Sequence, residues 1–214
     1  MDKEYFNIKD NCRKGLLKYL SKAISIIPII DKPKILDVGC GSGVPTLLLA
    51  DKFNGNITAV DSDKKSINKL AEKVKELNLS NRITIHNCSL FDIKVEKAQF
   101  DLIIAEGILN VVGFKKGFLR IKKLLNGFLI IHDEFSNQNK RIEFIENNNF
   151  KILDWFVLDE KIWWNDYFKC LEKEISSISN KEFLKLFKTD LKEIELSKKH
   201  SPQYNSVYYV IEKI

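Results

Sequence analysis

Glycines and carboxylates near the start of the chain have the spacing of a turn that cradles a nucleotide. Residues 35–50 read ILDVGCGSGVPTLLLA, in which an apolar run precedes three alternating glycines, from Gly39 to Gly43, and then a helical pattern. Glycines permit positive φ and let a ligand approach the main chain, while a helix start offers unpaired N–H groups. Asp37 precedes the turn, and Asp61 ends the next apolar run, where α/β nucleotide folds hold ribose hydroxyls. These residues indicate a cofactor site at the carboxyl ends of two strands.

The glycine spacing separates two kinds of cofactor. The dinucleotide fingerprint G-x-G-x-x-G needs Gly or Ala at position 44, where this chain has Val44. The pattern present is Asp37-x-Gly39-x-Gly41-x-Gly43, which resembles motif I of the class I S-adenosylmethionine (SAM)-dependent methyltransferases. That resemblance implies SAM as the cofactor, S-adenosyl-L-homocysteine (SAH) as the product, and methyl transfer by in-line displacement.

The same resemblance assigns the cofactor contacts. Asp37 would reach the SAM amino group directly or through water, and Asp61 would hold the ribose hydroxyls. Ser89 stands where the family often has an Asp that meets the adenine amino group, so this contact departs from the family pattern. The residues expected at the cofactor are Asp37, Gly39, Cys40, Gly41, Gly43, Asp61, Ser62, Ser89, Leu90 and Ala105.

A carboxylate and an imidazole are the candidates for acid–base chemistry. Residues 105–131, AEGILNVVGFKKGFLRIKKLLNGFLII, resemble a segment of UbiE-like small-molecule methyltransferases, in which Glu106 and the glycines after it match. The resemblance implies that Glu106 faces the methyl-transfer pocket. His132 is its expected catalytic partner, because both residues end neighbouring strands. The alternatives are that Glu106 caps a turn and that His132 has a structural role.

Aromatic residues in the last third of the chain form a candidate substrate pocket. Trp163, Trp164 and Tyr167 follow the sixth expected strand, and Tyr204 precedes the last. They would roof the acceptor, or they would fill the core of a cap. The motif [DNS]-P-P-[YFW], used on flipped bases, is missing at residues 105–108, which favours a small-molecule acceptor over nucleic acid.

Alternating strands and helices must position these residues. Apolar runs predict strands at 35–38, 57–61, 82–88, 100–106, 128–134, 150–158 and 205–214. The alternation implies right-handed crossovers and a mostly parallel sheet. The resemblance adds a Rossmann-like α/β fold with seven strands in the order 3-2-1-4-5-7-6, helices on both faces and a small helical cap. A helix over 115–125 should reach the fifth strand through a turn at Asn126-Gly127.

We expect a single domain over residues 1–214. Residues 1–30 would form an N-terminal helical lid, and residues 159–200 a helical cap inserted before the last strand. A chain of 214 residues, 44% of them hydrophobic, suits one folded domain. Its apolar runs are strand-length and its N-terminus lacks the core of a signal peptide, so we expect a cytoplasmic protein without membrane insertion.

The cysteines and the net charge bear on metals and partners. Cys12, Cys40, Cys88 and Cys170 form no C-x-x-C pair, so we expect four free thiols and no metal site. The net charge of +6 is compatible with nucleic acid, but the lysines are scattered over solvated faces.

A small-molecule methyl acceptor is therefore the expected partner. Three alternatives stay open: an RNA or DNA methyltransferase, a non-catalytic SAM-binding regulatory subunit, and an aminopropyltransferase that uses decarboxylated SAM. The acceptor atom and the oligomeric state do not follow from the sequence.

Overall fold

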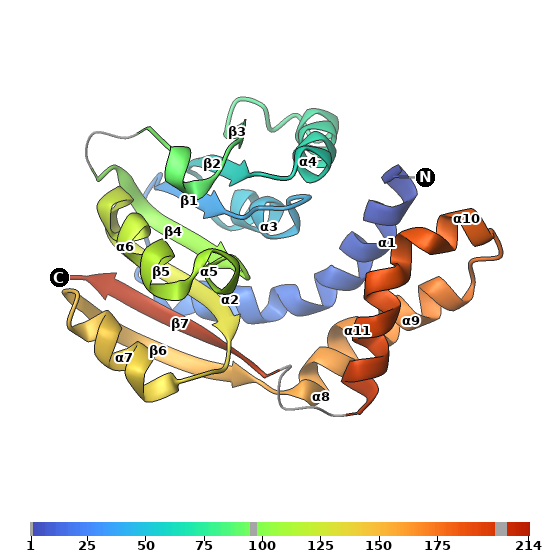
Figure 1. The fold of residues 1–214 in the computed structure, drawn as a ribbon. Coiled ribbons are helices and arrows are strands. Elements are labelled where there is room, and N and C mark those ends of the chain that lie inside the picture. The colour runs from blue at the N-terminus through green and yellow to red at the C-terminus, as the bar shows by residue number, and fades with distance from the viewer. Residues whose placement is uncertain (1, 95–97, 200–204) are drawn as a thin grey trace.

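Seven strands form one twisted sheet in the computed structural model, which describes residues 2–94, 98–199 and 205–214 (Figure 1). The strands are β1 (Lys34–Val38), β2 (Asn56–Asp61), β3 (Ile83–Asn87), β4 (Phe100–Glu106), β5 (Leu125–Glu134), β6 (Phe150–Leu158) and β7 (Ser206–Lys213). Their order in the sheet is β3-β2-β1-β4-β5-β7-β6. The first five strands pair in parallel, and β7 lies antiparallel between β5 and β6. The expected α/β architecture and strand order are confirmed.

Helices cover both faces of the sheet because its central strands are apolar on both sides. Ile35 and Leu36 follow one another in β1, are fully buried, and belong to different apolar clusters. The first cluster lies under α2 (Leu17–Ile26), α3 (Val44–Lys52) and α4 (Lys64–Glu76). The second lies under α5 (Leu109–Val112), α6 (Phe114–Leu124) and α7 (Gln138–Glu146). Side chains alternate between the faces of a strand, so a strand buried on both faces reads as a continuous apolar run.

The N-terminal helix packs on the helices that follow β6, away from the main sheet (Figure 1). The elements involved are α1 (Asp2–Arg13), the 3-10 turn η1 (Lys14–Leu16), α8 (Glu160–Trp163), the π-helical segment η3 (Trp164–Phe168), α9 (Lys169–Ser176), α10 (Lys181–Leu184), the 3-10 turn η4 (Lys185–Phe187) and α11 (Lys188–Lys198). A third apolar cluster joins α1 and η1 to this group through Cys12, Leu16, Leu171 and Phe187. We call α1 the lid helix and α8 to α11 the cap.

Two of the four cysteines are paired, so the expectation of four free thiols is wrong. Cys12 in the lid helix and Cys170 in α9 form a disulfide with their Cα atoms 5.5 Å apart. The two residues are 158 positions apart in sequence, and only the packing of α1 on α9 brings them together. Cys40 and Cys88 are free.

The expected turn at Asn126-Gly127 is also wrong, because both residues belong to β5. A Cβ at Gly127 would lie 2.5 Å from the carbonyl oxygen of Asp101, so glycine here allows a close approach of the main chain to β4. Over the three described ranges, no helix is both long and apolar enough to cross a bilayer.

Candidate active site

The glycine turn after β1 is held in place by main-chain geometry. The Gly39 N–H donates to the Val60 carbonyl at 2.8 Å, which ties the turn to β2. Gly39, Gly41 and Gly43 have φ values of +72°, +53° and +87°, which L side chains rarely adopt. A Cβ at Gly43 would collide with the Leu70 side chain, whereas a Cβ at Gly41 would meet nothing within 4 Å. Glycine at position 43 therefore allows the turn to pack against Leu70, whereas glycine at position 41 leaves open space beside the turn.

Asp61 braces the glycine turn from the end of β2. Its Oδ2 accepts a hydrogen bond from the Gly41 N–H at 2.8 Å, and its Oδ1 accepts one from the Asp63 N–H at 2.8 Å. An ionised carboxylate offers about four acceptor positions, so both oxygens retain capacity for hydroxyl donors. Ser62 follows directly and is exposed.

Asp37 lies beneath the turn and is buried. Its Oδ2 accepts a hydrogen bond of 2.6 Å from the Thr46 hydroxyl in the first turn of α3. Burial raises the pKa of Asp37 to about 7, because a charged carboxylate is poorly solvated there. A cation brought close to this carboxyl group would lower its pKa again.

The residues expected near adenine follow β3 and begin the 3-10 turn after it. The Ser89 hydroxyl accepts a hydrogen bond of 3.3 Å from the Phe91 N–H and so caps the 3-10 turn η2 (Leu90–Asp92). Leu90 is buried. Ala105 pairs with Val38 across β4 and β1, which brings the following residue, Glu106, level with the glycine turn.

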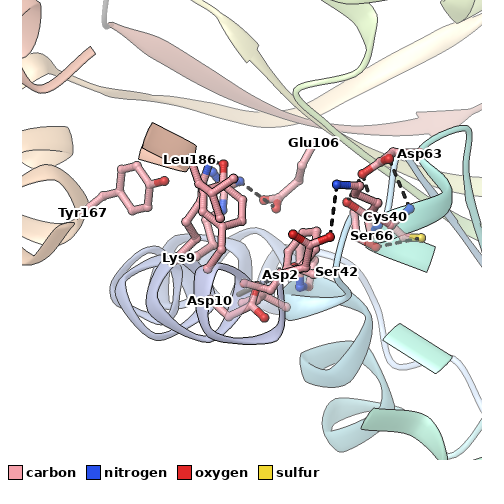
Figure 2. Close-up of a pocket in the computed structure, with 18 residues that line it drawn as sticks. Asp2, Lys9, Asp10, Cys40, Ser42, Asp63, Ser66, Glu106, Tyr167 and Leu186 are labelled. Carbon is pink, nitrogen blue, oxygen red and sulfur yellow. Dashed lines mark hydrogen bonds and ion pairs between the residues drawn. The ribbon is translucent and has the colours of Figure 1, made fainter. Parts of the chain in front are cut away.

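A cavity of about 620 Å³ is lined by the glycine turn, the lid helix and the cap. In Figure 2, Glu106 lies between Lys9, Tyr167 and Leu186 on one side and the glycine turn on the other. The residues that line the cavity are Asp2, Tyr5, Phe6, Lys9, Asp10, Arg13, Gly39, Cys40, Gly41, Ser42, Val44, Pro45, Asp63, Lys65, Ser66, Glu106, Tyr167 and Leu186. The cavity thus combines predicted cofactor residues with Glu106 and Tyr167.

Three side chains converge on the Glu106 carboxylate, which is 7% exposed. The Tyr208 hydroxyl in β7 donates to Oε1. The Arg13 guanidinium of the lid helix lies 3.4 Å from Oε2, and His132 Nδ1 lies 3.9 Å from Oε1. The carboxylate is therefore held in one orientation by groups from three separate elements.

His132 stands behind Glu106 and is not among the described residues that line the cavity. Its ring stacks on Tyr208 at 4.2 Å and on Trp163 at 5.8 Å. Its Nε2 lies 2.8 Å from the Ser206 hydroxyl, which also accepts a hydrogen bond of 2.9 Å from the Trp163 indole. Burial lowers the pKa of His132 to about 4, so the imidazole is neutral at pH 7.

The predicted aromatic residues divide between cavity and core. Tyr167 lines the cavity and also belongs to the apolar cluster of lid and cap. Trp163 packs toward β7 through Ser206, and Trp164 lies under the Lys198 ammonium, 5.9 Å from its ring. Tyr204 lies outside the described residues.

Asp10 of the lid helix holds α1 on the glycine turn and was not predicted. It accepts a hydrogen bond from the Ser42 hydroxyl and forms an ion pair of 2.6 Å with Lys73. Lys73 also donates to the Ser42 carbonyl at 2.7 Å. Arg13, Tyr208 and Ser206 were missed as well, because each acts on a residue far away in sequence. Within residues 2–94, 98–199 and 205–214, no three His, Cys, Asp or Glu side chains are grouped to hold a metal.

A family model described as a methyltransferase domain matches residues 30–190. The chain belongs to the class I SAM-dependent methyltransferases. The match includes the glycine turn, Asp61, Glu106 and most of the cap, and the cofactor of this family is SAM. The family model is not specific for the UbiE-like subtype that residues 105–131 resemble.

Two curated relatives differ in the acceptor that their names state. The ribosomal protein L11 methyltransferase of Ruminiclostridium cellulolyticum is 31% identical over 83 residues, which are 38% of this chain and 26% of that protein. The ribosomal RNA small subunit methyltransferase G of Psychrobacter cryohalolentis is 28% identical over 102 residues, 47% of this chain and 41% of that protein. The chain spans less than half the length of these relatives.

Solved structures share the fold at low sequence identity. The [4+2]-cyclase SpnF superposes with a TM-score of 0.78 at 15% identity, covering 92% of this chain and 80% of that one. A geranyl diphosphate methyltransferase in complex with SAM gives 0.66 at 13% identity, covering 91% and 85%. At such identities the likeness shows the fold alone.

Proposed function

We propose that this chain transfers the SAM methyl group to a small molecule bound beside Glu106. The observation that carries the proposal is the cavity of about 620 Å³ between the glycine turn and the lid helix. Small-molecule sites typically measure about 300–1,000 Å³ and sit at the carboxyl ends of α/β strands. The lid helix and the cap cover this cavity, which suits a small acceptor better than a nucleic acid strand.

The proposed cofactor contacts follow the strand ends. Gly39, Cys40 and Gly41 would lie along the methionine part of SAM, with Asp37 and the Ala105 carbonyl near its amino group. The remaining contacts are Asp61 for the ribose hydroxyls, with Ser62, Ser89 and Leu90 around the adenine. Gly43 would shape the turn without touching the ligand, in line with its packing on Leu70.

In the proposed reaction, SAM supplies an activated methyl group and the protein aligns the acceptor in line with the carbon–sulfur bond. Glu106 would orient the acceptor nucleophile and accept its proton where it carries one. Arg13 and Tyr208 would hold the carboxylate in place, and neutral His132 would support Tyr208 by stacking. The lid helix and Tyr167 would keep water away from the sulfonium.

Titration calorimetry tests the cofactor, and a metabolite screen for SAH release tests the reaction. We expect SAM and SAH to bind and NAD not to bind. Binding of NAD without binding of SAM would overturn the proposal. Release of SAH with one class of small metabolite, lost in Glu106→Gln, would identify the acceptor.

An RNA methyltransferase is the second candidate, supported by the net charge of +6 and by the name of the ribosomal RNA relative. It predicts a complex with RNA that weakens steeply with salt, because phosphate contacts release counterions. Methyl transfer to RNA in a chain that is inactive on the metabolite panel would favour this candidate. SAM binding without transfer to either class would favour the regulatory subunit.

A further inference from the structure

We propose that Cys12 and Cys170 form a redox modification site that fixes the lid helix over the cavity when oxidised. Reduction by a low-molecular-weight thiol would release the lid helix. No sequence motif marks this pair, since the two cysteines are 158 positions apart.

The disulfide joins two walls of the cavity. Cys12 lies between Asp10, which accepts from Ser42 of the glycine turn, and Arg13, which contacts Glu106. Cys170 lies on α9, one helical turn after Tyr167, a cavity residue of the cap. The covalent bond therefore links the helix that covers the glycine turn directly to the cap.

Few side chains of the lid helix are fully buried. Of its twelve residues, only Asp10 and Cys12 are buried. Tyr5 and Ile8 are partly buried against the apolar cluster of lid and cap, and two ion pairs add to this packing, Lys9 with Asp190 at 2.7 Å and Arg13 with Glu106 at 3.4 Å. The disulfide adds a covalent link to these contacts, and we expect its loss to loosen the lid helix.

The two cysteine residues differ in exposure, so we expect attack at Cys170. Cys12 is 2% exposed and Cys170 is half-buried. A thiolate RS⁻ would attack the Cys170 sulfur and form a mixed disulfide, while Cys12 leaves as a thiolate and takes up a proton. A second RS⁻ would attack the R-bound sulfur of the mixed disulfide, which releases RSSR and the Cys170 thiolate, and this thiolate also takes up a proton. Two RSH are oxidised to RSSR and one protein disulfide becomes two thiols.

Closure and release of the lid helix should control cofactor exchange. The lid helix contacts the glycine turn through Asp10 and Ser42, so a fixed lid helix retards the departure of SAH. This consequence rests on the proposed function, whereas the existence of the redox pair does not. In cytosolic proteins, disulfides are usually transient and serve catalysis or redox sensing.

Disulfide mapping tests the pair itself. The protein is purified without reductant, its free thiols are alkylated, and its peptides are analysed by mass spectrometry. We expect the Cys12 and Cys170 peptides to be linked, with Cys40 and Cys88 alkylated after denaturation. Full alkylation of Cys12 and Cys170 without reductant would overturn the proposal.

Hydrogen exchange and SAH release test the role of the pair. We compare oxidised protein, reduced protein, Cys12→Ser/Cys170→Ser, and Cys88→Ser as the matched control. Loss of a long-range disulfide should speed exchange of the α1 amides and SAH dissociation by roughly tenfold or more, with the central strands unchanged. The reduced wild type tests this even if the double variant does not fold. The Cys88→Ser protein should respond to reductant as the wild type does.

The outcomes separate this proposal from the proposed function. If Cys12 and Cys170 are linked and the lid helix responds to reductant, but the protein binds no SAM, only the proposed function is wrong. If the protein binds SAM, but reduction changes neither the hydrogen exchange of α1 nor the rate of SAH release, only the redox proposal is wrong.

Discussion

The cofactor side and the acceptor side of the cavity are built over different distances along the chain. On the cofactor side, the bond from Gly41 to Asp61 joins residues 20 positions apart. On the acceptor side, Glu106 is held by Arg13 and Tyr208, which are 93 and 102 positions away. The predicted cofactor residues from Asp37 to Ser62 therefore lie in one strand–turn–helix–strand unit, whereas the groups around Glu106 meet only when the sheet and the lid helix are assembled. Substitutions on the two sides should separate cofactor binding from methyl transfer.

The largest expected effect separates transfer from cofactor binding. Glu106→Gln should lower methyl transfer by about 10²–10⁴, the usual contribution of a positioned acid or base, because the amide cannot accept a proton. SAM affinity should stay within a few fold. Glu134→Gln is the matched control, since Glu134 ends the neighbouring strand but is exposed. Transfer at the parent rate in Glu106→Gln would leave Glu106 as a turn cap.

Asp37 on the cofactor side and His132 on the acceptor side should change the stability of the fold with pH in opposite directions. The folded pKa of His132 is lowered to about 4 from 6.5, so the unfolded chain binds more protons in that interval and stability rises with pH. The folded pKa of Asp37 is raised to about 7 from 3.8, so its contribution is present at low pH and is lost as pH rises through 7. At 1.36 kcal/mol per pKa unit, the effect is about 3 kcal/mol for His132 and about 4 kcal/mol for Asp37.

Single variants should separate the pH effects of Asp37 and His132 on stability. Between pH 4 and 6.5, the unfolding free energy of Asp37→Asn should rise with pH more steeply than that of the wild type. The unfolding free energy of His132→Gln should fall with pH relative to that of the wild type. Urea denaturation at several pH values measures both. Identical pH dependence of the unfolding free energy in the two variants would show that neither Asp37 nor His132 has the shifted pKa given above.

Asp61→Ala should weaken SAM binding by about 1.5–3 kcal/mol, the usual worth of hydrogen bonds to a charged group. The variant also removes the acceptor for the Gly41 N–H, so the glycine turn loses a brace. Calorimetry measures the loss, and Asp51→Ala, at an exposed position of α3, is the control. Equal SAM affinities of Asp61→Ala and Asp51→Ala would show that Asp61 does not bind the cofactor.

A smaller effect distinguishes two glycines of the same turn. Gly43→Ala should be less stable than Gly41→Ala by about 1–2 kcal/mol, because only at position 43 does the new Cβ collide with Leu70. SAM affinity should fall mainly in Gly41→Val, where the side chain fills the open space beside the turn. Thermal denaturation and calorimetry together check this contrast, and equal stability of the two alanine variants would contradict it.

Local patterns predicted the sheet well. The central strands are buried on both faces, so their apolar runs mark them without reference to the rest of the chain. The glycine turn and Asp61 were predictable for the same reason, since φ values and strand ends are local properties. The place of β7 between β5 and β6 came from the family resemblance, because antiparallel insertion leaves no periodic signal.

Long-range partners were not predictable. Cys12 and Cys170 carry no spacing signal, and a cysteine pair is set only by how α1 packs on α9. Tyr208 meets His132 because β7 pairs with β5 in one register, and a shift by one residue would turn its side chain to the other face. Gly127 resembled a turn residue, but the close approach of Asp101 requires glycine inside the strand.

A crystal structure with SAM bound tests the central claim most directly, namely that the cofactor side and the acceptor side form one reaction cavity. We expect the ribose on Asp61, the methionine part along Gly39 to Gly41, and the methyl group facing Glu106 beneath the lid helix. A methyl group directed away from Glu106, or SAM bound outside this cavity, would contradict the account.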